Sequence, residues 1–186
     1  MIEIQKLNAQ NITFIFIDLQ ERLLSNISDS RKIVLRNILL LECARALEMP
    51  FIVTTQYRKG LGGLIQQFGD RLSTDPMDKN TFSCSANAKI REEVMRFGRD
   101  WTVLSGVETH ICVLQTALDL LREGYQVAVV ADATSARKDF DRDIGLKRME
   151  QSGALVVTTE MLIYELLGRS DSDAFKKLLP LIKENN

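Results

Sequence analysis

The segment Trp101-Thr-Val-Leu-Ser-Gly-Val-Glu-Thr-His-Ile-Cys112 contains the pattern that decides the fold. It opens on a run of apolar and β-branched residues, turns at Gly106, and continues as a helical pattern to Glu123. Apolar runs without polar alternation are typical of strands buried on both faces of a parallel sheet. A buried strand followed by a turn and a helix is half of a βαβ unit.

The same pattern recurs along the chain. Strands are predicted over residues 13–17, 51–55, 101–105, 126–130 and 154–158, with a short edge strand within 72–79. Helices are predicted over 30–49, 80–97, 110–123 and 139–152, with one or two more in 159–184. Alternating strands and helices predict a doubly wound, three-layer α/β/α sandwich with a mostly parallel, Rossmann-like sheet of about six strands. Because no linker interrupts the pattern, residues 1–186 are expected to form one domain.

Composition excludes several classes of function. The chain has 186 residues and a formal net charge of −1, which argues against a nucleic-acid or membrane surface as partner. Its apolar runs are too short to span a bilayer, and its first residues do not resemble a signal peptide. The three cysteines are far apart, which fits reduced thiols. A cytoplasmic protein with a small-molecule substrate is therefore expected.

Ligands of such sheets bind beyond the carboxyl ends of the strands, and polar residues that lie there are candidates for chemistry. Cys112 is the strongest, because it lies near the start of the helix after the third long strand. The N–H groups and dipole of a helix N-terminus lower a thiol's pKa and stabilise an oxyanion. The alternative is that Cys112 is a small buried hydrophobe.

Two further residues complete the candidate set. Asp18 ends the first strand, where a desolvated carboxylate is suited to general-base work, although strand ends also carry ordinary loop carboxylates. Lys79 is a cation that could stabilise both Asp18 and a Cys112 thiolate, although most lysines are solvated.

Three stretches together resemble the isochorismatase-like cysteine hydrolase family: Ile17-Asp-Leu-Gln20, Lys79-Asn-Thr-Phe-Ser83 and Gly106-Val-Glu-Thr-His-Ile-Cys-Val113. Thr55-Gln-Tyr-Arg-Lys-Gly-Leu-Gly62 is similar to the subgroup of isochorismatase-domain-containing proteins of unassigned substrate.

The resemblance implies a role for each matching residue. Cys112 would be the nucleophile, Asp18 the base and Lys79 the third member of a triad. It also implies an oxyanion hole formed by the N–H groups of Glu108 and Cys112, a cis peptide between Val107 and Glu108, and a homo-oligomer, dimer or higher.

The resemblance also limits cofactors and suggests a pocket. Nicotinamidases bind a metal through histidines after the second strand, whereas this chain has Thr55-Gln-Tyr57 there, so neither a metal nor another cofactor is expected. The expected substrate contacts are Gln20, Tyr57, Phe82 and Val107. The predicted activity is hydrolysis of a small amide-type C–N bond through a thioester.

Other interpretations stay open. A scaffold or binding protein that retains the triad with little turnover is the main alternative, and a redox role for Cys112 ranks last because no resolving cysteine is near in sequence. Cys84 competes weakly as nucleophile. His110 is two residues from Cys112 and points to another helix face. Asp132 could orient a substrate or serve a turn.

Two further segments have more than one interpretation. The glycine-rich residues 59–63 are expected to form a flexible loop over the pocket, and not a phosphate cradle. The apolar stripe of the C-terminal helix could mediate oligomerisation or pack on the chain's own sheet. That stripe consists of Phe175, Leu178, Leu179 and Ile182.

Overall fold

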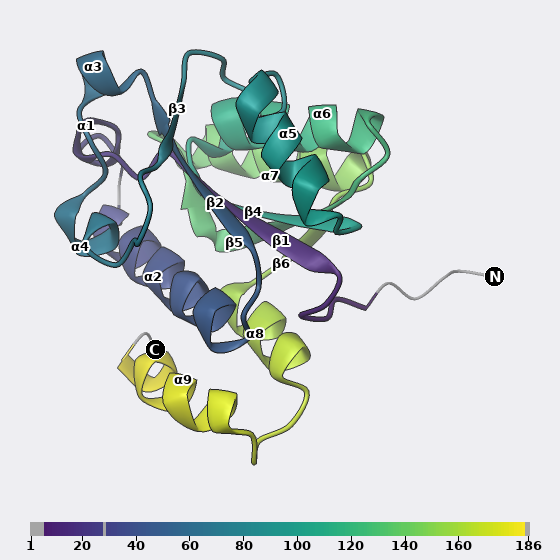
Figure 1. Cartoon of the computed structure of the whole chain (residues 1–186). Coiled ribbons are helices and arrows are strands. Elements are labelled where there is room, and N and C mark those ends of the chain that lie inside the picture. Colours follow the sequence, from purple (N-terminus) through teal and green to yellow (C-terminus); the bar gives the residue numbers. More distant parts are fainter. Residues whose placement is uncertain (1–5, 28, 185–186) are drawn as a thin grey trace.

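The computed structural model describes residues 6–27 and 29–184, and its centre is a six-stranded sheet (Figure 1). The strands are β1 (Ile12–Ile17), β2 (Phe51–Gln56), β3 (Met77–Lys79), β4 (Trp101–Val107), β5 (Gln126–Ser135) and β6 (Leu155–Val157). They lie in the order β3-β2-β1-β4-β5-β6, and every neighbouring pair is parallel. The predicted fold class is confirmed, with all strands parallel.

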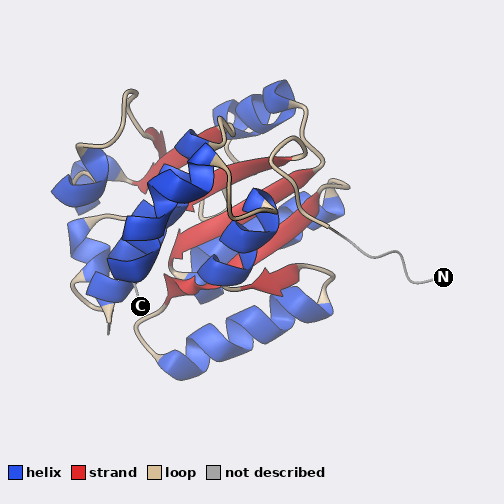
Figure 2. Cartoon of the chain, turned by 90° about the horizontal axis from the view of Figure 1, so that it is seen from below, coloured by secondary structure: helices blue, strands red, loops and turns tan. Residues whose placement is uncertain are grey.

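Helices cover both faces of the sheet (Figures 1 and 2). One face carries α5 (Ala88–Phe97), α6 (Leu114–Arg122) and α7 (Asp139–Gln151), and the other carries α2 (Ser30–Ala46) and α8 (Thr159–Leu167). Helix α9 (Asp173–Glu184) lies outside α2 and α8. Three short helices, α1 (Glu21–Leu24), α3 (Arg58–Leu61) and α4 (Gln66–Gly69), lie in the connections around β2.

Strand β1 shows why the apolar runs are continuous. All six of its residues are buried, because successive side chains enter two different cores. Phe14 and Phe16 pack into the core beneath α2, with their rings stacked at 5.6 Å between centroids. Ile15 and Ile17 enter the core beneath α5, α6 and α7. Burial of both faces holds β1 at the centre of the sheet.

The chain order reverses between β1 and β4, which are neighbours in the sheet but far apart in sequence. The connections from these two strands therefore leave in opposite directions and open a crevice at their carboxyl ends. Asp18 follows β1 directly, and the segment with Cys112 follows β4. The topology thus brings two of the three predicted catalytic residues to the same place.

The predicted helix over 80–97 is wrong in its first half. Residues 80–87 form turns, and α5 begins only at Ala88. The Thr81 hydroxyl donates to the Ser83 carbonyl at 2.8 Å, which competes with helical bonding. The Asn87 side chain then accepts from the N–H groups of Lys89 and Ile90, and this N-cap fixes the start of the helix.

Other boundaries also differ from the prediction. Residues 131–135, expected to follow a strand, belong to β5, which continues past a register shift opposite Leu104 and Gly106. The helix predicted to start at His110 begins instead with a π-helical turn, η1 (Thr109–Val113). Helix α2 ends at Ala46, before the left-handed residue Glu48.

The stripe on α9 packs within the chain. Leu178 and Ile182 are buried, and α9 contacts α2 and α8. The stripe therefore packs on helices, whereas one of the two sequence-based interpretations placed it on the sheet. Within the described residues, no helix has the length and apolarity needed to cross a membrane.

Candidate active site

Asp18 is held in an unusual backbone conformation at the end of β1. Its φ of 54° lies in the left-handed region, which aspartate tolerates better than most residues, and its side chain is fully buried. The Thr54 hydroxyl donates to Oδ1 at 2.7 Å. The Lys79 ammonium donates to Oδ2 at 2.6 Å. Both carboxylate oxygens are therefore engaged from strands on the same side of β1.

Lys79 ends β3, and its ammonium is as fully buried as Asp18. Besides Asp18, Nζ donates to Gln56 Oε1 at 2.7 Å and to the Thr81 carbonyl at 3.4 Å. Burial is the largest single effect and lowers the pKa of Lys79, but the attractions of Asp18, Cys84 and Cys112, with the hydrogen bond to Asp18, together outweigh it and raise the pKa above its usual value. Lys79 is therefore charged at neutral pH. Breaking such a pair by removing one partner is costly, because the other is left as an uncompensated buried charge.

Cys112 reaches the same place from β4 through a tight connection. Gly106 has φ 108°, and a Cβ there would lie 2.0 Å from the Ile17 carbonyl oxygen, so only glycine allows β4 to approach β1 this closely. The chain then enters η1, in which the Val113 N–H donates to the Glu108 carbonyl at 3.2 Å. Cys112 lies on this turn and is 6% exposed.

The electrostatics of Cys112 differ from the sequence-based expectation of a lowered pKa. Burial, then the Asp18 carboxylate, raise the pKa of the Cys112 thiol to about 12, while the Lys79 ammonium works in the opposite direction. A hydrogen bond with Asp18 also raises it. Desolvation and a facing carboxylate outweigh the position near a helix start. The resting site thus holds a protonated thiol beside a carboxylate.

Cys84 is closer to the site than its place in the sequence suggested. Its N–H donates to the Thr116 hydroxyl at 2.9 Å, and that hydroxyl donates to the Cys112 carbonyl at 2.7 Å. Burial raises the pKa of its thiol to about 11, with Lys79 lowering it. Cys84 is completely buried, whereas Cys112 retains some exposure to solvent.

The expected substrate contacts lie in different environments. Tyr57 is 50% exposed and Phe82 is 54% exposed, so their rings are open to a ligand. Val107 is fully buried, and the Val107–Glu108 peptide is cis. Glu108 lies at the start of η1 and forms an ion pair with Arg137 at 3.0 Å.

Gln20, also expected to contact a substrate, is buried and engaged within the protein. Its Nε2 donates to the Gln56 carbonyl at 3.1 Å and to the Gly62 carbonyl at 2.6 Å. Its Oε1 accepts from the Gln56 N–H at 2.7 Å. The side chain therefore ties β2 to the connection after α3.

Sequence reasoning missed Thr54 and Gln56, which contact Asp18 and Lys79 directly. Both lie on β2, in the segment Phe51-Ile-Val-Thr-Thr-Gln56. Their signal was the presence of polar residues at the end of an otherwise apolar buried strand.

Asp132 and His110, the two other candidates from the sequence, form contacts that hold the fold together. Asp132 accepts from the N–H and hydroxyl of Thr159, and it pairs with Arg36 at 3.5 Å. These bonds join β5 to the start of α8. His110 packs against α7, where a Cβ on Gly145 would lie 3.1 Å from its Cα.

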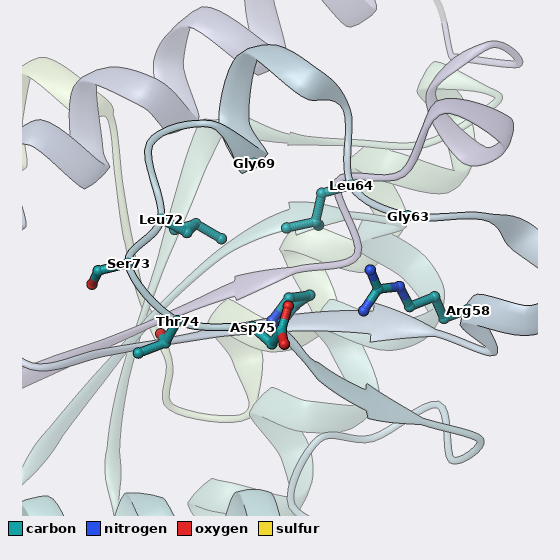
Figure 3. Close-up of a pocket in the computed structure, with 9 residues that line it drawn as sticks. Arg58, Gly63, Leu64, Gly69, Leu72, Ser73, Thr74 and Asp75 are labelled. Atoms are coloured by element: carbon teal, nitrogen blue, oxygen red, sulfur yellow. The ribbon is translucent and has the colours of Figure 1, made fainter.

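A cavity of about 400 Å³ lies in the connection between β2 and β3. Figure 3 shows Leu64 and Leu72 facing one another across it, and Arg58 extending toward Asp75. Neither Asp18, Lys79 nor Cys112 lines it. Residues 59–63 are predicted as a flexible loop, but residues 59–61 belong to the short helix α3 at the edge of this cavity, and only 62–63 lie outside it.

Comparison with known proteins bears on this geometry. The family model for the isochorismatase domain matches residues 13–161. The chain belongs to the isochorismatase family. It is similar to isochorismatase domain-containing protein 2 of Xenopus laevis, with 37% identity over 184 residues, 97% of this chain and 88% of that protein.

Solved structures of this family share the fold. MAR1 ribonuclease from Caenorhabditis elegans has a TM-score of 0.89 and 38% identity, over 96% of this chain and 93% of its own. YcaC from Pseudomonas aeruginosa, described with hexane-2,5-diol and a covalent acrylamide, has a TM-score of 0.91 and 25% identity, over 97% and 93%. YcaC from Escherichia coli, described as an octameric hydrolase of unknown specificity, has a TM-score of 0.92 and 24% identity, over 100% and 95%.

Proposed function

We propose that residues 1–186 act as one hydrolase domain that cleaves the C–N bond of a small amide, with Cys112 as nucleophile, Asp18 as base and Lys79 as third member of the triad. The observation that carries the proposal is the Asp18–Lys79 pair, fully buried at 2.6 Å beside the thiol of Cys112. A buried ion pair is weak evidence for stability alone. Its place beside a partly accessible thiol is what a coupled nucleophile and base require.

In the first step, Asp18 takes the proton from Cys112 as the sulfur attacks the substrate's carbonyl carbon. A C–S bond forms, and the carbonyl π electrons move to the oxygen. Because the pKa of the resting thiol is raised to about 12, proton removal accompanies attack and does not precede it. Lys79 balances the negative charge that the site then holds.

In the second step, the C–N bond breaks and the amine leaves with the proton held by Asp18. The N–H groups of Glu108 and Cys112 are proposed to stabilise the tetrahedral oxyanion. The remaining thioester is attacked by a water whose proton passes to Asp18. The C–S bond then breaks, the carboxylic acid leaves, and the Cys112 sulfur takes back the proton from Asp18.

A small substrate fits the enclosed site. Cys112 is only 6% exposed and Asp18 and Lys79 are fully buried, so a large polymer has little access. Exposed Tyr57 and Phe82 and the buried Val107 are proposed to contact the substrate, whereas Gln20 is proposed to act indirectly, through its bonds to β2. The reaction needs neither a metal nor another cofactor.

A nucleic acid is not the proposed partner, although one relative is called a ribonuclease. The net charge of −1 provides little electrostatic attraction for a polyanion. We further propose a cytoplasmic setting, where the free thiols of the three buried cysteines stay reduced.

We also propose a homo-oligomer. Phe140 on α7 is 74% exposed, and Ile144 one turn later is exposed too, so a second copy could cover them. Light scattering should show a mass above that of one chain, and Phe140→Glu should lower it. A monomer at micromolar concentration would contradict this part.

Trapping of the acyl-enzyme tests the proposed activity. The protein is incubated with a panel of small primary and secondary amides, quenched in acid, and analysed by mass spectrometry. The expected result is an acyl adduct on Cys112 that hydroxylamine releases as a hydroxamate. Cys112→Ala should lose both adduct and turnover, whereas the matched control Cys84→Ala should keep them. Full turnover by Cys112→Ala would overturn the proposal, as would RNA cleavage that depends on Cys112.

The raised pKa of Cys112 favours one alternative, a binding or scaffold protein that retains the triad with little turnover. It predicts that substrate-like amides bind without acylating Cys112. Acyl-enzyme formation on any amide of the panel would exclude it.

A further inference from the structure

The Lys79 ammonium has three hydrogen-bond donors, and the structure accounts for all of them. Two of the contacts are short: 2.6 Å to Asp18 Oδ2 and 2.7 Å to Gln56 Oε1. The third, to the Thr81 carbonyl, is 3.4 Å and hence weak. A lysine ammonium is a point charge on a flexible stem, so its direction depends on its acceptors. Gln56 fixes Lys79 as closely as the ion pair does.

Gln56 is itself fixed at both its side chain and its backbone. Its Nε2 donates to the Asn80 carbonyl at 3.2 Å, so its Oε1 is the end that faces Lys79. The Gln20 amide forms bonds with both the N–H and the carbonyl of Gln56. The next residue in the chain, Tyr57, donates its N–H to the Lys79 carbonyl at 2.8 Å. The backbone of Gln56 is thus held by Gln20, and its side-chain amide is held by Asn80 on the side opposite Lys79.

The same bonds reach the surface. Gln20 Nε2 also donates to the Gly62 carbonyl at 2.6 Å, just after α3. A continuous series of hydrogen bonds therefore runs from Gly62 through Gln20 and Gln56 to Lys79, and from there to Asp18. The segment that begins with exposed Tyr57 is therefore connected to the buried base both through the backbone at Gln56 and through these hydrogen bonds.

We propose that Gln56 is a positioning residue, which holds the Lys79 ammonium toward Asp18 and Cys112 and links it through Gln20 to the segment at Gly62. This inference rests on the proposed function, since it assumes that Lys79 acts on the Cys112 thiolate. A neutral amide suits this role, because a carboxylate at position 56 would compete with Asp18 for Lys79 and cancel its charge.

The test is the pH–rate profile of Cys112 alkylation by acrylamide, followed at the Cys112 peptide by mass spectrometry. The charged and titratable groups that face this thiol are Asp18, Lys79 and Cys84. The variants are Gln56→Met, which removes the acceptor at similar volume, and Gln56→Glu, which keeps an acceptor but adds charge. Thr55→Val is the matched control. It lies on the same strand, is buried, and loses a bond to Asp78 without touching Lys79 or Asp18.

Gln56→Met should slow alkylation at pH 8 by about five-fold, because a mispositioned Lys79 stabilises the thiolate less. Gln56→Glu should move the profile upward by about one pH unit while its thermal midpoint stays closer to wild type than that of Gln56→Met. Thr55→Val should lower the thermal midpoint and leave the profile in place.

A Gln56→Met protein that loses stability but keeps the wild-type profile would overturn the inference, because Gln56 would then be merely structural. Lys79→Met distinguishes this failure from failure of the proposed function. If Lys79→Met displaces the profile and Gln56→Met does not, only the role of Gln56 is refuted. If Lys79→Met leaves the profile unchanged, the coupled triad itself is refuted.

Discussion

The buried ion pair between Asp18 and Lys79 should show strong energetic coupling. Each side chain is fully buried, so Asp18→Asn leaves an ammonium, and Lys79→Met a carboxylate, without its partner charge. Each single substitution should therefore cost about 3–5 kcal/mol of unfolding free energy. The double variant removes both charges, and it should cost several kcal/mol less than the sum of the two singles.

Urea denaturation followed by circular dichroism measures all four corners of this cycle. Thr55→Val serves as the control, because it removes a partly buried bond on the neighbouring strand β2 without leaving a buried charge unpaired. Additive costs would refute the reasoning, since they would mean that neither charge depends on the other. Single costs below about 1 kcal/mol would also refute it, because that is the range of exposed pairs.

Two further predictions concern backbone geometry and pH. Gly106→Ala should lower the unfolding free energy by more than about 3 kcal/mol and displace Cys112. The reason is that residue 106 has φ 108°, and a Cβ there would lie 2.0 Å from the Ile17 carbonyl oxygen. An unchanged thermal midpoint would contradict this close approach. Burial raises the pKa of Cys43 from 9.0 to about 12, so its contribution to stability is fully present below pH 9 and is lost as pH rises toward 12. Cys43→Ala should therefore remove about 1.4 kcal/mol per pH unit from the alkaline fall in stability between pH 9 and 11, and an unchanged slope in denaturant titrations at these pH values would contradict it.

The fold could be predicted from sequence because its determinants are local. Apolar runs such as 12–17 report burial on both faces, and glycines and prolines mark where helices end. Prediction failed where side chains compete with the backbone for hydrogen bonds. Residues 80–87 have the composition of a helix start, but the bond from Thr81 to Ser83 and the cap at Asn87 delay the helix.

The candidate site could be predicted only in part. Asp18 follows a strand, Lys79 ends a strand and Cys112 lies near the start of a helix, and these positions are visible in sequence. The raised pKa of Cys112 could not be predicted from the sequence, because it depends on burial and on a carboxylate that follows another strand. The roles of Thr54 and Gln56 likewise arise from side-chain contacts between strands, which no local pattern encodes.

The central claim is that Asp18 and Lys79 act on the Cys112 thiol with opposite sign. It is tested most directly by the pH–rate profile of Cys112 alkylation in Asp18→Asn and Lys79→Met, under conditions where both variants are folded. A unit charge about 4 Å away in a partly buried site changes a pKa by roughly one to three units. The account predicts a profile displaced to lower pH in Asp18→Asn and to higher pH in Lys79→Met. Profiles that coincide with wild type, or that move in the same direction, would contradict it.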